Sequence, residues 1–207
     1  MFSHRALGLM AGIALSLLLP ISAAHACACC AEPGDRFDRA EAIDEYALDV
    51  LAAVKFEGKA RLYTTAADWA EQIKGITNPA ESDTYDLKAS RTARAWTFVL
   101  SDTKGHKGRL TVRTPAKVHK FHADTKPQAR TSGGYVPTKL YKEWRLAGSV
   151  TGAGMFTFKK SAKSQAKLIL HGTGNGCTSA DQFTNWTLDV AGRGVQFRFF
   201  GTLRNVQ

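Results

Sequence analysis

The chain has 207 residues, of which 44% are hydrophobic, and a formal net charge of +10. That length is enough for one domain with a substantial hydrophobic core. Its bases are scattered singly through strand-like segments, as at Lys55, Arg109 and Lys142, and no aromatic-interleaved recognition pattern accompanies them. The composition therefore argues against nucleic acid as a partner and predicts a solvated basic surface.

The first 26 residues have the three parts of a secretory signal peptide. Met1–Arg5 is positively charged, residues 6–19 are apolar, and Ala24-His25-Ala26 places small residues at positions −3 and −1 of a cleavage site. The apolar run is too short to anchor the chain in a membrane, and no later segment is long enough to be transmembrane. We therefore expect an exported protein, periplasmic or secreted.

Cleavage after Ala26 would make Cys27 the first residue of the mature chain and would lower the net charge to +9, because Arg5 is the only charged residue removed. A lipid anchor at Cys27 is the secondary interpretation, since a lipid-acceptor cysteine is expected to follow a large aliphatic residue at −3, where Ala24 stands. The chain divides into a signal peptide over 1–26, a cysteine-rich arm over 27–40 and a single β-rich domain over 41–207.

The domain opens with an ambiguous segment. Residues 41–54 fit a helical stripe and a strand alternation equally well, and their Ala and Glu content favours a helix that passes into a strand near Val54. A short strand is expected over 59–64. A second short helix is expected over 65–74, with Thr65 as its cap and Gly75 at its end.

From there the pattern indicates short strands. They are expected over 95–101, 109–114, 118–123, 140–150, 155–158, 166–171, 184–190 and 195–203. Gly192-Arg193-Gly194 supplies a hairpin turn between the last two. The glycines of 148–154 fit a sharply bent strand. Hairpin spacing of this kind predicts a mainly β protein, an antiparallel β-barrel or β-sandwich, with one or two short N-terminal helices. A calycin-like barrel is one form that the pattern allows.

The cysteines carry the only distinctive side-chain chemistry. Cys27, Cys29 and Cys30 lie together in the arm, and Cys177 follows the glycine-rich segment 172–176. In an oxidising compartment these cysteines are expected to form a disulfide between the arm and Cys177. Thiolates this close could instead ligate copper or zinc, with Cys177 as a fourth ligand. The glycines are expected to give Cys177 the flexibility to reach the arm.

Other candidates for chemistry are weak. His122 and Asp124 share one face of a strand, which is the minimum for a hydrogen-bonded pair. No nucleophile motif and no catalytic triad is present, and 172–177 lacks the following helix and the Lys-Ser/Thr pair of a phosphate-binding loop. The sequence therefore predicts a non-catalytic exported β protein that binds an unidentified ligand or envelope component. The alternative is a periplasmic protein that handles copper or zinc through the four cysteines.

Overall fold

The computed structural model describes residues 31, 33–63, 73–77, 83–125, 139–158 and 163–204. These residues are mainly β, and eight strands close into an antiparallel barrel that is accompanied by one α-helix. The predicted mainly β, antiparallel fold is therefore confirmed, and of the two forms predicted, barrel and sandwich, the structure has the barrel. In the described part of the chain no helix is long and apolar enough to cross a membrane. The second helix predicted, over 65–74, falls mainly outside the described residues.

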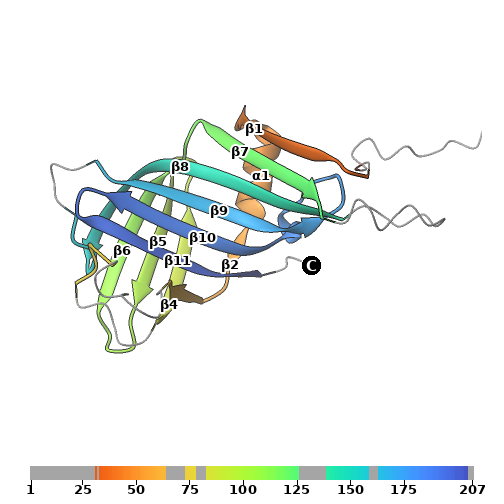
Figure 1. Cartoon of the computed structure of the whole chain (residues 1–207). Helices are drawn as coiled ribbons and strands as arrows, with labels where there is room; N and C mark the ends of the chain where they lie inside the picture. The colour runs from red at the N-terminus through yellow and green to blue at the C-terminus, as the bar shows by residue number, and fades with distance from the viewer. Residues whose placement is uncertain are drawn as a thin grey trace, which may run out of the picture.

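In chain order the elements are β1 (Arg36–Ala42), α1 (Glu45–Ala53), β2 (Lys55–Phe56), β3 (Lys59–Leu62), β4 (Thr84–Arg91), β5 (Ala95–Ser101), β6 (Lys107–Arg113), β7 (Lys117–Asp124), β8 (Leu140–Gly154), β9 (Gln165–Gly174), the 3-10 helix η2 (Ala180–Gln182), β10 (Phe183–Gly192) and β11 (Val195–Arg204). Around the barrel the neighbours are β8, β6, β5, β4, β3, β11, β10 and β9, and β9 pairs back with β8 (Figure 1).

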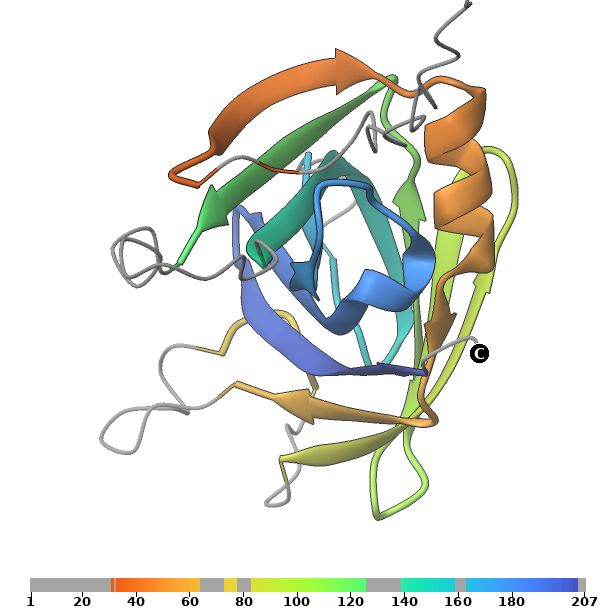
Figure 2. The same cartoon turned by 90° about the vertical axis from the view of Figure 1, so that its right-hand side faces the viewer.

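Strand β8 organises the barrel, because it changes its neighbour along its length. Its first ten residues pair with β9 on one edge, and on the other edge residues 140–145 pair with β7. Residues 150–154 pair with β6 instead. Strand β7 thus leaves the barrel wall, and β1 pairs with it along Arg36–Ala42. We call β1 and β7 the outer ribbon, which curls away from the barrel in Figure 2.

Glycine occupies the point at which β8 changes its neighbour. A Cβ atom at Gly148 would lie 2.1 Å from the backbone oxygen of Arg113, the last residue of β6. At the other end of the strand, Gly154 has φ +69° and a Cβ there would lie 2.3 Å from the Lys107 oxygen. The glycines of 148–154 therefore permit close backbone approach where β8 and β6 meet.

Helix α1 confirms the predicted passage from helix to strand. Asp44 caps it, because its Oδ1 accepts a hydrogen bond from the Ala47 nitrogen at 2.8 Å. Ala47, Val50 and Leu51 are buried on one face. After Val54 the chain becomes extended, and β2 pairs with the end of β11. The helix therefore stands beside one end of the barrel (Figure 2).

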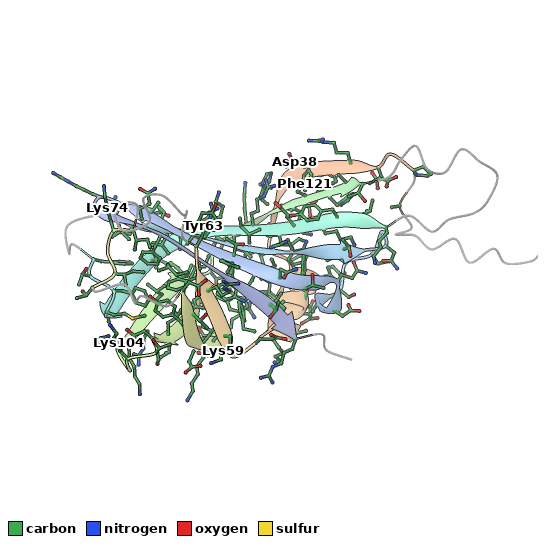
Figure 3. All side chains as sticks on the ribbon, turned by 60° about the horizontal axis from the view of Figure 1, so that its bottom comes forward. Asp38, Lys59, Tyr63, Lys74, Lys104 and Phe121 are labelled. Atoms are coloured by element: carbon green, nitrogen blue, oxygen red, sulfur yellow. The ribbon has the colours of Figure 1, made fainter. Side chains whose placement is uncertain are left out.

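Aromatic side chains fill the barrel interior. Trp96, Trp144 and Trp186 are at most 2% exposed, as expected for tryptophans in core strands. The Phe56 ring makes edge contacts with Trp96, Phe98 and Trp186, with ring centroids 5.3–5.5 Å apart. In contrast, exposed lysines such as Lys59 and Lys104 extend from the molecule's surface (Figure 3). The segment from β2 thus helps to close the aromatic core.

Two strands were not predicted. Strand β4 alternates buried Tyr85 and Leu87 with polar positions, but it contains Asp, Lys and Ala, which are depleted in strands. Strand β1 lies across the predicted boundary between arm and domain, and most of its side chains are exposed. Conversely, the strand predicted over 155–158 is reduced to one bridge between Phe156 and Ile76. Weak local propensity explains the two omissions, because pairing with neighbours decides these strands.

The Gly148→Ala variant is expected to lose about 1–3 kcal/mol of unfolding free energy, because the new methyl group must displace the Arg113 carbonyl. Gly58→Ala is the matched control, since the nearest atom to a Cβ there is the Leu87 oxygen at 4.0 Å. Urea denaturation followed by tryptophan fluorescence measures both. Equal midpoints for the two variants would contradict the close approach.

Candidate functional site

Four parts of the chain meet at one end of the barrel, which we call the helix end. They are α1, the β4–β5 hairpin at Arg91 and Trp96, the segment 175–182 between β9 and β10, and the end of β11 at Arg204. In Figure 2 the 175–182 segment lies over the barrel opening and α1 stands beside it. Loops and strand ends gathered on a rigid barrel are a common place for binding sites.

The helix end contains a cavity of about 490 Å³ between α1, β2, β4, β5 and β11. Its apolar surface comes from Leu51, Val54, Phe56, Leu87 and Trp96. Four cationic residues border it, of which Arg91 is half-buried and Lys55, Lys88 and Arg204 are exposed. The lining that the structure describes contains no carboxylate. The cavity therefore combines apolar walls with charged residues that are all cationic.

Arg91 reaches the cavity because of its place in β4. Alternate residues of this strand, Tyr85, Leu87 and Ala89, point toward the interior, and Arg91 continues the same row at the strand's end. It pairs in register with Trp96 across the hairpin, and its guanidinium carbon lies 5.5 Å from the Trp96 ring centroid. The arginine therefore sits over an aromatic ring at the barrel mouth.

The polar atoms of this pair have no acceptors among the described residues. Nε and Nη2 of Arg91 are buried without a hydrogen-bond partner, and so is Nε1 of Trp96. Burial lowers the pKa of the Arg91 guanidinium. A buried donor without a partner costs about 1–3 kcal/mol, so unpaired donors in a cavity indicate where a ligand could bind.

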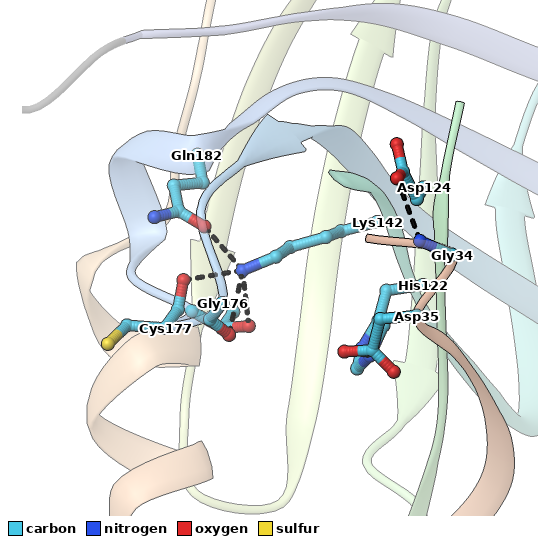
Figure 4. A network of polar contacts seen from close by, with 9 residues as sticks. Gly34, Asp35, His122, Asp124, Lys142, Gly176, Cys177 and Gln182 are labelled. Atoms are coloured by element: carbon cyan, nitrogen blue, oxygen red, sulfur yellow. Dashed lines mark hydrogen bonds and ion pairs between the residues drawn. The ribbon is translucent and has the colours of Figure 1, made fainter. Parts of the chain in front are cut away.

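A second polar cluster lies inside the helix end. The Lys142 side chain is 1% exposed, which corrects the expectation that this base belongs to a solvated surface. Its Nζ donates to the backbone oxygens of Gly176 (3.4 Å) and Cys177, to Thr178 Oγ1 at 3.1 Å and to Gln182 Oε1 at 2.7 Å (Figure 4). One buried ammonium thus fixes the whole segment between β9 and η2.

The glycines before Cys177 have a packing role rather than the flexible role predicted. Gly172 and Gly174 belong to β9, and a Cβ at Gly172 would lie 2.0 Å from the Gln182 oxygen. The disulfide predicted between Cys177 and the arm stays a prediction. Figure 4 shows its carbonyl oxygen directed toward Lys142 and its side chain extending away. Cys27, Cys29 and Cys30 lie outside the described residues.

His122 and Asp124 have different partners. His122 Nε2 lies 3.4 Å from Asp35 Oδ2, and its ring stacks on Phe37 with centroids 5.2 Å apart. Asp124 Oδ2 accepts a hydrogen bond from the Gly34 nitrogen at 3.0 Å (Figure 4). Both contacts join β7 to the chain that enters β1. On this geometry the two side chains hold the two strands of the outer ribbon together.

The other histidines are dispersed. His106 Nδ1 lies 2.7 Å from Asp102, and His119 Nε2 lies 3.0 Å from Asp38. Burial lowers the pKa of His171, while the nearby Glu143 raises it. Within the described ranges, no three His, Cys, Asp or Glu side chains gather closely enough to hold a metal ion. A metal site through the arm cysteines stays a prediction.

Sequence reasoning did not find Arg91 or the role of Lys142. The signal for Arg91 was available in the alternation of Tyr85, Leu87, Ala89 and Arg91, which places an arginine in an inward-facing row. Lys142 likewise alternates with Trp144 and Leu146 on the buried face of β8. A cation in an apolar row, rather than a cation in a strand, is the informative pattern.

The comparisons with known proteins found no relative. No protein-family model, no curated protein and no solved structure matches this chain. The function must therefore be inferred from the geometry of the helix end.

The Lys142 cluster predicts a pH dependence of stability. Burial lowers the pKa of Lys142 from 10.5 to about 8, while Asp181 raises it. Between pH 8 and pH 10.5 the unfolded chain keeps the Lys142 proton, whereas the folded chain releases it. The free energy of unfolding should therefore rise with pH by up to about 1.4 kcal/mol per pH unit. Urea denaturation at several pH values should show this rise relative to Lys142→Met. Lys117→Met, at an exposed position, is the control and should keep the wild-type dependence of unfolding free energy on pH. If wild type and Lys142→Met showed the same pH dependence, the effect would be excluded.

We also predict that Cys177 pairs with one of the three arm cysteines, because a lone thiol is unfavourable in an exported protein. Closing a loop of roughly 150 residues would stabilise the fold by on the order of 4–5 kcal/mol, before native strain is subtracted. Peptide mapping of the non-reduced mature protein should recover one peptide joined to residues 27–30. Recovery of Cys177 as an unmodified peptide would refute the pairing.

Proposed function

We propose that the protein is an exported, non-catalytic binding protein that takes a small ligand into the cavity at the helix end. The observation that carries this proposal is the cavity itself. Its volume of about 490 Å³ falls in the range of roughly 300–1,000 Å³ that is typical of small-molecule sites. A binding site of this kind combines apolar walls with a few polar groups that orient the ligand.

The composition of the cavity supports binding rather than catalysis. The described lining holds no His, Cys, Asp or Glu, the side chains that most often act as general acids, general bases or nucleophiles. Ser90 is its one hydroxyl, and the described lining offers no His or carboxylate to activate it. Support for export comes from the signal-peptide pattern of residues 1–26, with the periplasm or the extracellular medium as the destination.

Cavity filling tests the proposal directly. Ala89 lines the cavity and is only partly buried, so Ala89→Phe should place a ring in it. We expect at least one of three small probes, 2-naphthoate, 2-naphthylmethanol or 2-naphthylmethylamine, to bind the mature protein with one-to-one stoichiometry in calorimetry. Ala89→Phe should weaken that binding by more than about tenfold.

Ala40→Phe is the matched control, because Ala40 is exposed on β1 and does not line the cavity. It should bind as the wild type does. Circular dichroism of both variants separates a filled cavity from a disrupted fold. Absence of binding by all three probes, or unchanged binding in folded Ala89→Phe, would overturn the proposed site.

Metal handling is the competing proposal, and it uses different residues. Copper or zinc would be held by Cys27, Cys29, Cys30 and Cys177, since thiolates are good ligands for both. Metal analysis of protein purified under reducing conditions separates the two proposals. Stoichiometric metal that disappears when the arm cysteines are replaced by Ser would favour metal handling. Oxidised cysteines without metal would favour the structural disulfide.

A further inference from the structure

We infer that the ligand of this cavity is an amphipathic oxyanion, a carboxylate or phosphate group carried on an apolar body. The inference rests on the binding function proposed above and adds the chemical class of the ligand. Three independent features of the helix end point to it: the charge of the residues that border the cavity, the unpaired edge of one buried guanidinium, and the apolar surface beneath that group.

The lining gathers cations without counterions. Lys55, Lys88, Arg91 and Arg204 all contribute to the cavity, and none of them takes part in an ion pair among the described residues. Two arginines elsewhere in the barrel are paired, Arg61 with Asp83 and Arg198 with Asp189. An anion entering this cavity therefore meets a concentrated positive potential, whereas a cation would be repelled.

The unpaired atoms of Arg91 define the shape of the missing partner. Nε and Nη2 lie on the same edge of the guanidinium, and both are buried without an acceptor. That edge donates two parallel hydrogen bonds, which match the two oxygens of a carboxylate or phosphate group. A neutral ligand with one acceptor would leave one of the donors unpaired. The geometry thus favours a bidentate oxyanion over a single carbonyl or hydroxyl.

The surroundings of Arg91 favour an apolar body on the same ligand. The Trp96 ring lies under the guanidinium at 5.5 Å, and the Phe56 ring packs against Trp96 at 5.5 Å. Leu51, from α1, adds an aliphatic wall. The buried Trp96 Nε1 supplies a further donor without a partner. An ion such as free phosphate would satisfy Arg91 but leave these walls in contact with water.

Three matched probes test the class. Calorimetry should show that 2-naphthoate binds roughly 10- to 100-fold more tightly than 2-naphthylmethanol, the gain expected from charge-assisted hydrogen bonds. The cation 2-naphthylmethylamine should bind most weakly. A fourth probe, 2-naphthyl phosphate, distinguishes a preference for phosphate from one for carboxylate, and either preference fits the inference. Inorganic phosphate alone should bind more weakly than both anionic probes.

Arg91→Gln should reduce the affinity for 2-naphthoate to that for 2-naphthylmethanol, while Arg91→Lys should keep part of the difference. Arg109→Gln is the control, because Arg109 is exposed on β6 and lies outside the cavity lining. It should retain the full preference.

Different outcomes overturn the oxyanion preference and the binding function. Equal binding of the neutral and anionic probes, or an undiminished preference in Arg91→Gln, would overturn the oxyanion while leaving a ligand-binding cavity. Absence of binding by every probe would overturn the proposed function as well.

Discussion

Pairing along β8 is the constraint on which the rest of the structure depends. This strand closes the barrel against β9, holds β6 along its last residues and carries β7 along its first ones. Such an exchange of neighbours requires the two backbones to approach closely at Gly148, where a side chain would meet the Arg113 carbonyl. That approach lets β8 pair with β6 beyond the point at which β7 leaves the wall.

The helix end follows from that closure. Because eight antiparallel strands share the barrel, their ends form one rim, and the rim places Arg91, Trp96 and Arg204 around one cavity although they come from different strands. On the same rim, Lys142 fixes the segment after β9 with a single buried ammonium. Rigid strands thus set both the packed part of this end and the part that is open to a ligand.

More of the fold than of the candidate site could be predicted from the sequence. Alternation and hairpin turns indicated an antiparallel barrel or sandwich, because those signals are local. Strand β4 was not predicted, because its residues have low strand propensity and it is stabilised by pairing with β3 and β5. The cavity depends on that strand, so Arg91 could not be placed beside Trp96. The inward position of Lys142 was readable, but its partners lie 34 to 40 residues away in sequence.

The outer ribbon also has a consequence for self-association. A closed barrel has no free edge, but β1 ends the sheet path with β7 as its single strand neighbour among the described elements. An unpaired strand edge is a template for pairing with another chain. Here that edge carries the sequence Arg36-Phe37-Asp38-Arg39-Ala40-Glu41-Ala42, with four charges of both signs in seven residues. Any second strand that added to β1 would have to accommodate those charges, which disfavours open-ended growth of the sheet from molecule to molecule.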